Sequence, residues 1–293
     1  MVSGVATPMV AYVVVDGKTV MSGSRMTIIA GVFSICAILC YIVCFKLTSE
    51  RVEVPASNQK ISASAIFKSI FTNKALLGII VAAIFVLLSQ LTVLNLAGYV
   101  YPNVYGSAAA QSAASLLGTV VMLVVCAPFA SKLSAKFGKK ELAMGSSIFS
   151  ALVWLVCLIW RPASVWGFVA CYILANIGMG FFNTIIWAMI TDVIDDAEVR
   201  NGVREDGTIY SVYSFARKLG QAFSSGLVGA LLGIIGYTEA TAFDPAVTRG
   251  IFNMACIAPI IGFVCIVLAL AFLYPLNKKK VEENVAELAA RRN

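Results

Sequence analysis

Apolar residues in this chain come in long runs that charged residues rarely interrupt, and polar residues gather in the short stretches between them. Each run is close to the roughly 20 residues that a helix needs to cross the hydrocarbon core of a bilayer. The runs predict helices near residues 26–45, 75–100, 112–131, 142–160, 165–190, 209–236 and 250–275. We therefore expect an all-α integral membrane protein with about seven full transmembrane helices.

The first stretch, residues 1–15 ("MVSGVATPMVAYVVV"), is apolar but too short to cross a membrane alone. It has no positively charged segment ahead of its apolar part, so it does not fit a secretory signal. We expect it to be a partial helix, the final turns of a span that begins before this chain.

The polar segments predict the domain organisation. The longest, residues 46–74, carries Pro55, Ser57 and Asn58 near its centre and fits a cytoplasmic linker. It would join residues 1–45, the end of one helix bundle, to a six-helix bundle at 75–275, followed by a cytoplasmic tail at 276–293. No loop is long enough to bury a soluble core.

Composition supports the membrane interpretation. Only 13% of the residues are charged, whereas soluble domains carry about 25%. The net charge of +7 does not indicate nucleic-acid binding, because the charges lie between apolar runs. Lys and Arg are concentrated in alternate loops, which by the positive-inside rule are cytoplasmic. Both the C-terminus and the 189–207 loop are on that side, and we expect a cell (plasma) membrane protein of bacterial type.

Several classes of chemistry are disfavoured. The chain has no histidine, the commonest general base and metal ligand. Its eight cysteines all lie in apolar runs and none forms a C-x-x-C pair, which argues against a zinc or redox site. We therefore expect neither an enzyme nor a bound cofactor.

The helix at 209–236 carries a polar stripe on one face, at spacings of three and four residues: Ser211, Ser214, Lys218, Gln221 and Ser225. Such a stripe must face protein or water, because unpaired polar groups in hydrocarbon cost several kcal/mol. Lys218 lies about 13 Å along the helix from Ile209 at 1.5 Å per residue. A lysine at this depth often marks a substrate or ion pathway. The alternative is that it extends its amine to the cytoplasmic surface.

Two other helices carry amides and hydroxyls beside aromatic rings. They are Asn183, Thr184 and Trp187 in the span at 165–190, and Asn95 and Tyr99 in the span at 75–100. Such groups suit a sugar, whose hydroxyls need donors and acceptors while its apolar face stacks on a ring. Polar contacts between helices are the alternative explanation.

The segment "MITDVIDDAEVRNGVREDG" (189–207) gathers six acidic residues. Asp192, Asp195, Asp196 and Glu198 follow the expected C-terminal end of a helix, where the helix dipole disfavours negative charge. Positive partners are therefore expected, either Arg200 and Arg204 nearby or Lys132 and Lys136 in the neighbouring cytoplasmic loop. We predict a cytoplasmic ion-pair gate; a solvated charge run is the alternative.

These residues resemble a family signature. The series Asp192-Val-Ile-Asp195, Glu198, Arg200, Gly202, Arg204, Gly207, Tyr210-Ser211, Phe215 and Lys218 is similar to that of the glycoside–pentoside–hexuronide:cation symporters, the melibiose permease-like branch of the major facilitator superfamily. Residues 127–140 ("APFASKLSAKFGKK") also resemble that superfamily's basic loop. The resemblance covers nearly the whole chain and implies a major facilitator-type helix bundle.

The resemblance implies sugar or glycoside transport coupled to a cation (sodium, lithium or a proton) by alternating access. Lys218 matches the family lysine implicated in cation and sugar binding, and Ser214 matches a sugar-facing hydroxyl; Gln221 joins them on the stripe. Asn183 departs from the family's aromatic residue, although Trp187 lies one turn along, and Asp196-Ala197 departs from its usual Tyr-Gly.

The family's cation-binding carboxylates lie in a first bundle, on helices that we do not find here. We therefore expect this chain to be a C-terminal portion of such a symporter, with a missing N-terminal half as partner beside the bilayer and the sugar. The counter-charges of Lys218 would belong to that half. The alternative is a non-transporting membrane subunit, or a half-transporter that works only with a partner.

Overall fold

The computed structural model describes residues 12–15, 18–21, 23–48 and 73–292. The chain divides into two compact units, Met1–Lys60 and Ile61–Asn293, and each is described by itself. The described part contains seven helices that are long and apolar enough to cross a membrane: Gly23–Leu47, Lys74–Val104, Ala110–Phe137, Lys139–Trp160, Val165–Asn201, Asp206–Ile235 and Pro245–Phe272. Each corresponds to one of the spans expected from the apolar runs.

In its described residues, the first unit contains a short hairpin and one long helix. Strands β1 (Tyr12–Val15) and β2 (Lys18–Met21) pair antiparallel, with Val15 opposite Lys18, and helix α2 covers Gly23–Leu47. The expectation of a helix is therefore wrong for residues 12–15, while residues 1–11 lie outside the described part. Consecutive β-branched valines favour a strand, and the sequence Asp16-Gly17 is typical of two-residue hairpin loops. Most of the expected linker, residues 49–72, also lies outside the described part.

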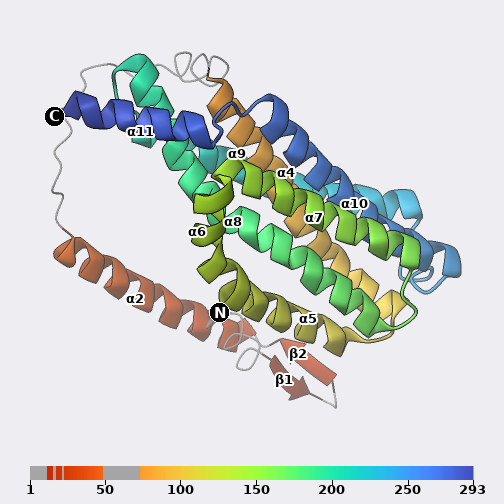
Figure 1. Cartoon of the computed structure of the whole chain (residues 1–293). Coiled ribbons are helices and arrows are strands. Elements are labelled where there is room, and N and C mark those ends of the chain that lie inside the picture. Colours follow the sequence, from red (N-terminus) through yellow and green to blue (C-terminus); the bar gives the residue numbers. More distant parts are fainter. Residues whose placement is uncertain (1–11, 16–17, 22, 49–72, 293) are drawn as a thin grey trace. The chain divides into compact units, whose positions relative to one another are not determined.

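The second unit is a bundle of long helices (Figure 1). Two of its spans contain a short π-helical turn, labelled η. The elements in order are α4 (Lys74–Tyr99), η1 (Val100–Val104), α5 (Ala108–Val121), η2 (Met122–Cys126), α6 (Ala127–Phe137), α7 (Lys139–Trp160), α8 (Val165–Asn201), α9 (Asp206–Ile235), α10 (Pro245–Phe272) and α11 (Lys278–Arg292).

Helix α10 packs against both α4 and α7. Helix α9 packs against α4, and helix α8 packs against α7. Small residues permit the closest approach: a Cβ atom on Gly220 of α9 would lie 2.8 Å from the carbonyl oxygen of Ile84 on α4. Near the start of α8, aromatic side chains surround Phe168. Its ring centroid lies 5.6 Å from that of Tyr101 and 5.9 Å from those of Trp154 and Phe252. These contacts hold the membrane helices in one packed body.

Helix α8 is longer than the apolar pattern predicted. It continues past residue 190 to Asn201, where Gly202 adopts the left-handed conformation (φ 73°) and its N–H bonds the carbonyl of Glu198. Asp192, Asp195, Asp196 and Glu198 therefore lie within the last turns of the helix, and their predicted placement after its end was wrong. Each gains a basic partner there, which offsets the unfavourable helix dipole.

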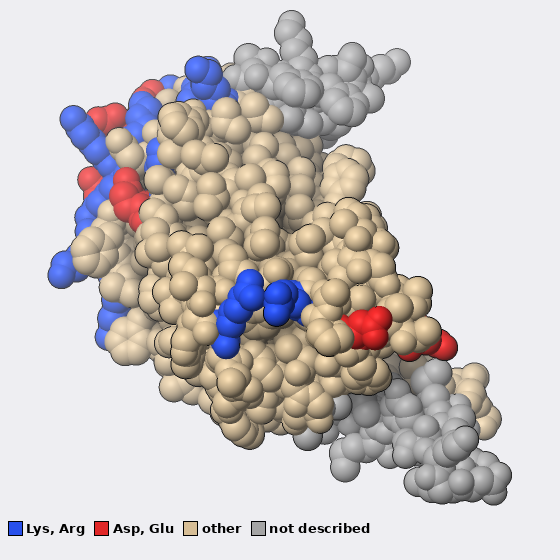
Figure 2. Space-filling model, turned by 90° about the vertical axis from the view of Figure 1, so that its right-hand side faces the viewer, with Lys and Arg blue, Asp and Glu red and all other residues tan. Residues whose placement is uncertain are grey.

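Charge is unevenly distributed over the surface. Figure 2 shows a face on which most of the Lys, Arg, Asp and Glu side chains gather along one edge, while the remainder is largely uncharged. Exposed apolar side chains such as Ile159, Ile234 and Phe272 cover the uncharged regions. This distribution suits a protein whose sides contact lipid and whose ends contact water.

Candidate functional site

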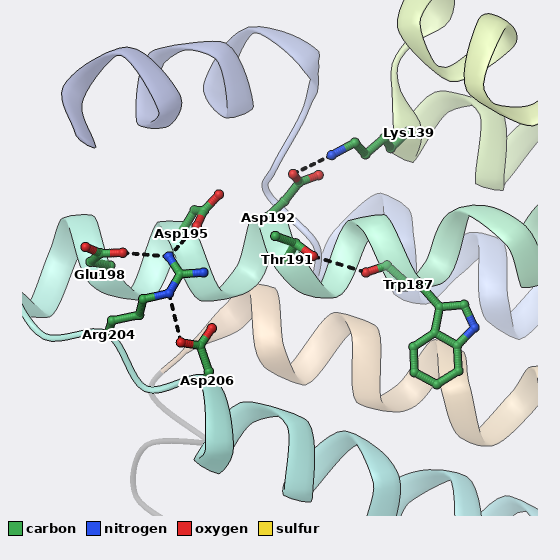
Figure 3. A network of polar contacts seen from close by, with 8 residues as sticks. All are labelled: Lys139, Trp187, Thr191, Asp192, Asp195, Glu198, Arg204 and Asp206. Atoms are coloured by element: carbon green, nitrogen blue, oxygen red, sulfur yellow. Dashed lines mark hydrogen bonds and ion pairs between the residues drawn. The ribbon is translucent and has the colours of Figure 1, made fainter. Parts of the chain in front are cut away.

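Arg204 is the centre of an ion-pair network in the turn between α8 and α9 (Figure 3). Its Nη1 lies 2.9 Å from an oxygen of Asp195 and 2.8 Å from one of Glu198, and its Nε lies 2.8 Å from one of Asp206. Partial burial lowers the pKa of Arg204, but the hydrogen bonds to the three carboxylates raise it more, so the net pKa lies above its usual value. The guanidinium thus ties the end of α8 to the start of α9.

A second pair connects α7 to α8. The Nζ of Lys139 lies 2.6 Å from Asp192 and also donates to the Ala188 carbonyl at 3.4 Å. Lys132 and Lys136, which the sequence offered as partners, are exposed on α6, and within the described residues neither pairs with a carboxylate. Lys139 has the role instead because it begins α7, which packs along α8.

Asp196 is the most deeply buried acid of the group, with 1% of its surface exposed. Arg200 contacts one carboxylate oxygen at 2.9 Å, and Asn284 of α11 donates to the other at 3.1 Å. Asn284 is itself 2% exposed. A buried carboxylate thus has both a counter-charge and a hydrogen-bond donor, as its burial requires.

Helix α11 contributes more than this one contact. The Arg291 guanidinium donates to the carbonyls of Glu198 and Val199 at 3.4 and 3.0 Å, which satisfies acceptors at the C-terminal end of α8. Lys278 donates to the Ala135 carbonyl of α6 at 2.9 Å. The tail expected at 276–293 is therefore an ordered helix through Arg292. The signal was the spacing of Val281, Asn284 and Leu288, which places them on one face.

The polar stripe lies on the outward side of α9. Ser211, Ser214, Lys218 and Ser225 are exposed, and Gln221 is half-buried. The Lys218 amine donates to the Gln221 side chain at 3.2 Å. Within the described residues no carboxylate pairs with Lys218, and the nearby acids of α8 already have other partners.

Trp187 links α8 to an adjacent face of α9. Its ring stacks on Tyr210 with centroids 5.9 Å apart, meets the edge of Tyr213 at 5.6 Å, and lies 5.3 Å from the guanidinium carbon of Arg217. The side chain is 43% exposed. Because Arg217 and Lys218 are consecutive, this aromatic cluster borders the polar stripe.

The remaining predicted residues do not form one group. Asn183 donates to Gln90 of α4 at 3.4 Å, and Thr184 bonds the carbonyl of Gly180 in its own helix. Asn95 is exposed. Tyr99 lies at the far end of α4, where its ring meets Tyr237 with centroids 5.0 Å apart.

The sequence analysis missed Gln90, which the structure brings to Asn183. Its signal was the presence of Ser89-Gln90 in the middle of an otherwise apolar run. Gln90 also borders a cavity of about 210 Å³ between α4, α5 and α8. Among the described residues, no group of three His, Cys, Asp or Glu side chains is arranged to hold a metal ion.

Comparison with known proteins identifies the family. Residues 1–278 match the family described as "MFS/sugar transport protein". The chain belongs to this family. It is therefore a multi-pass membrane protein of the major facilitator type, and the resemblance to its sugar:cation symporter branch is confirmed.

The curated relatives of this chain have names that describe transporters. An uncharacterized symporter YjmB of Bacillus subtilis is 29% identical over 89% of this chain, and a glucuronide carrier protein homolog of Escherichia coli is 28% identical over 89%. An isoprimeverose transporter of Lactiplantibacillus pentosus is 24% identical over 97%. The chain spans 57%, 56% and 60% of the length of these three relatives.

The structure shows which of the predicted site residues contact one another. Arg200 and Arg204 do pair with acids of α8, as expected from their positions. That these pairs act as a gate, and that Lys218, Ser214, Gln221, Asn183 and their neighbours bind sugar or respond to a cation, stay predictions.

Proposed function

We propose that this chain forms one helix bundle of a cation-coupled sugar or glycoside symporter that works by alternating access. The family and the names of the relatives, which include symporters, a glucuronide carrier homolog and an isoprimeverose transporter, support this proposal. The sugar binds between the polar side of this bundle and a second bundle, supplied by the same or another polypeptide. The protein moves its substrate without changing it chemically.

The observation that carries the proposal is the position of Lys218. It lies twelve residues beyond Asp206 at the start of α9, about 18 Å along the helix. Its amine is exposed on a polar face and meets only a neutral amide, Gln221, among the described residues. An unneutralised ammonium at this depth in a membrane is costly, so it requires a polar ligand, a counter-charge or water in a cavity.

The coupling cation binds in this proposal to carboxylates of the second bundle. Five acids of the α8–α9 region lie near the proposed cytoplasmic end and already contact Lys139, Arg200 or Arg204: Asp192, Asp195, Asp196, Glu198 and Asp206. Cation and sugar occupancy would therefore act on Lys218 across the interface between the two bundles. The bias of Lys and Arg among the loops supports a cytoplasmic C-terminus, and the bacterial organisms of the relatives support a bacterial plasma membrane location.

Lys218→Ala tests the proposal. Membrane vesicles containing this bundle together with a second bundle should take up labelled sugar along an imposed sodium or proton gradient. We expect the variant to lose gradient-driven uptake, because the charge that responds to both sites is removed. Lys279→Ala is the matched control, since Lys279 is exposed at the start of α11.

Two results would contradict the proposal. Wild-type coupling in Lys218→Ala would mean that the amine only reaches toward the membrane surface. Cation-driven uptake by the purified chain alone would mean that it needs no second bundle. Binding of sugar to the membrane-embedded complex without any uptake would instead favour a non-transporting subunit.

A further inference from the structure

The bundle contains a recess that none of the predicted site residues occupies. Its volume is about 210 Å³, and it lies between α4, α5 and α8 with residues of α7 and α10 behind it. None of the residues that line it carries a charge. Its polar and aromatic lining includes Gln90, Ser115, Thr119, Trp154, Tyr172 and Asn176.

Several polar groups in the recess are available to a ligand. Thr119 and Asn176 each donate to a carbonyl of their own helix, at 2.9 and 2.8 Å. Gln90 uses its carbonyl oxygen to accept from Asn183 at 3.4 Å. Within the described residues, neither the Gln90 amide nitrogen nor the Ser115 hydroxyl has a hydrogen-bond partner. The recess therefore offers a free donor and a hydroxyl that can donate or accept.

A π-helical turn forms one border of the recess. Met122, a lining residue, begins the turn η2 (Met122–Cys126). Cys126 donates to the Ile177 carbonyl at 3.3 Å, and a Cβ atom on Gly180 would lie 2.7 Å from its sulfur. Gly180 thus makes room for the turn against α8. Such turns occur frequently at functional sites, because they interrupt the regular helix and leave backbone groups and side chains in new positions.

We propose that this recess binds the uncharged, hydroxyl-bearing ring of the transported sugar; this inference rests on the proposed function and assigns its ring-binding subsite. Sugar hydroxyls both donate and accept, which matches the amides and hydroxyls of Gln90, Ser115 and Asn176. The apolar face of the ring suits the aromatic surface of Tyr172. A lipid chain in the same space would leave the Gln90 nitrogen and the Ser115 hydroxyl unpaired.

Because the lining of the recess carries no charge, the ring of a charged sugar and its negative substituent would contact different parts of the bundle. A carboxylate or sulfonate substituent finds no cation among the lining residues. The inference assigns such a substituent to Lys218, which lies on the exposed face of α9 and pairs with no carboxylate among the described residues. The recess therefore recognises the ring, and the α9 face recognises a negative group attached to it.

The test uses this bundle together with a second bundle in lipid nanodiscs and measures binding of D-glucose, D-xylose, D-galactose and D-glucuronate by calorimetry. Thr119→Val and Asn176→Leu remove polar groups from the recess with little change in volume. Each is expected to weaken binding of the preferred sugars about 10-fold, since a sugar hydroxyl loses its partner. The matched controls Thr248→Val and Asn253→Leu lie on α10 outside the recess and are expected to bind as the wild type does.

Thermal unfolding of each variant separates a binding effect from a folding effect. Equal affinities in recess and control variants would overturn the inference. Failure of the wild type to bind any of the four sugars would overturn it as well, because the recess would then hold only water.

Lys218→Ala separates this inference from the proposed function. It is expected to weaken binding of D-glucuronate but not of the neutral sugars, whereas Thr119→Val weakens both. Normal sugar binding in the recess variants together with lost uptake in Lys218→Ala would reject the recess and leave the proposed function standing. Weakened sugar binding in the recess variants together with normal uptake in Lys218→Ala would reject the role of Lys218 in the proposed function and leave the recess standing as a sugar site.

Discussion

Asp196 shows how a single buried charge fixes the C-terminal end of α8. Its two carboxylate oxygens contact different elements, Arg200 of its own helix and Asn284 of α11. Arg200 supplies a counter-charge but no hydrogen bond, so Asn284 provides the hydrogen-bond donor for this carboxylate in a site that water barely reaches. The amide of Asn284 therefore has a specific structural role, although its residue type gives no hint of it in a polar tail.

Asn284→Leu is expected to lower the free energy of unfolding by about 1–3 kcal/mol, the usual cost of leaving a buried acceptor without its donor. Chemical or thermal unfolding of the chain in nanodiscs measures the change. Val285→Ala is the neighbouring control, because Val285 is 53% exposed, and it should alter stability by less than about 0.5 kcal/mol. Equal effects of the two substitutions would show that Asn284 acts only through helix packing.

At the scale of elements, the apolar runs predicted the seven spans because a membrane requires every spanning segment to be long, apolar and internally hydrogen-bonded. The predicted end of α8, at residue 190, is too early, because the charged residues that follow it indicate a loop when only the apolar pattern is considered. In the structure each acid of α8 has a partner there, so the helix continues to Asn201. The pairing of Asp192 with Lys139 rather than with Lys132 or Lys136 depends on how α7 packs on α8, which no local pattern encodes.

The same reasoning explains the other differences. Two β-branched segments around Asp16-Gly17 form a hairpin. Because residues 1–15 are also apolar, the sequence equally fits a partial membrane helix, which is why a helix is expected there. The recess was missed because its lining comes from helices far apart in the sequence. Residues on one helix face, such as the α9 stripe, could be predicted, since helical spacing alone sets their placement.

Helix α11 stabilises the end of α8, which leads to a prediction about local dynamics. Ending the chain after Asn277 removes the Asn284 and Arg291 contacts to Asp196, Glu198 and Val199. Backbone amides in the last turns of α8 should then exchange with deuterium about 10-fold faster or more, as that end opens at lower free energy. Amides near Ala175, which is buried in the first half of α8, serve as the internal reference and should be unchanged. Uniform acceleration along α8 would indicate global destabilisation instead.

At the scale of the whole molecule, the Arg204 network predicts a shift between access states. Arg204 holds Asp195 and Glu198 of α8 and Asp206 of α9, so it keeps the end of α8 and the start of α9 together. If these pairs separate when the bundles rock, their loss favours the state that is open to the cytoplasm. Arg204→Gln leaves the half-buried Asp195 and Glu198 without their cation, and we expect the cytoplasm-open population to rise about 5-fold or more, a coupling of about 1 kcal/mol.

Labelling rates of a cysteine introduced at Ser214, on the exposed face of α9, measure that population from the cytoplasmic side. Asp206→Asn is the matched control within the network: it removes one contact, but Asp206 is 51% exposed, so its pair contributes little. The labelling rate should rise in Arg204→Gln and stay near the wild-type rate in Asp206→Asn. Raising the salt concentration should have little effect on the labelling rate of the wild type, because the pairs of Arg204 with Asp195 and Glu198 are partly shielded from water. An equal rise of the labelling rate in both variants would show that the network is a solvated charge run rather than a gate.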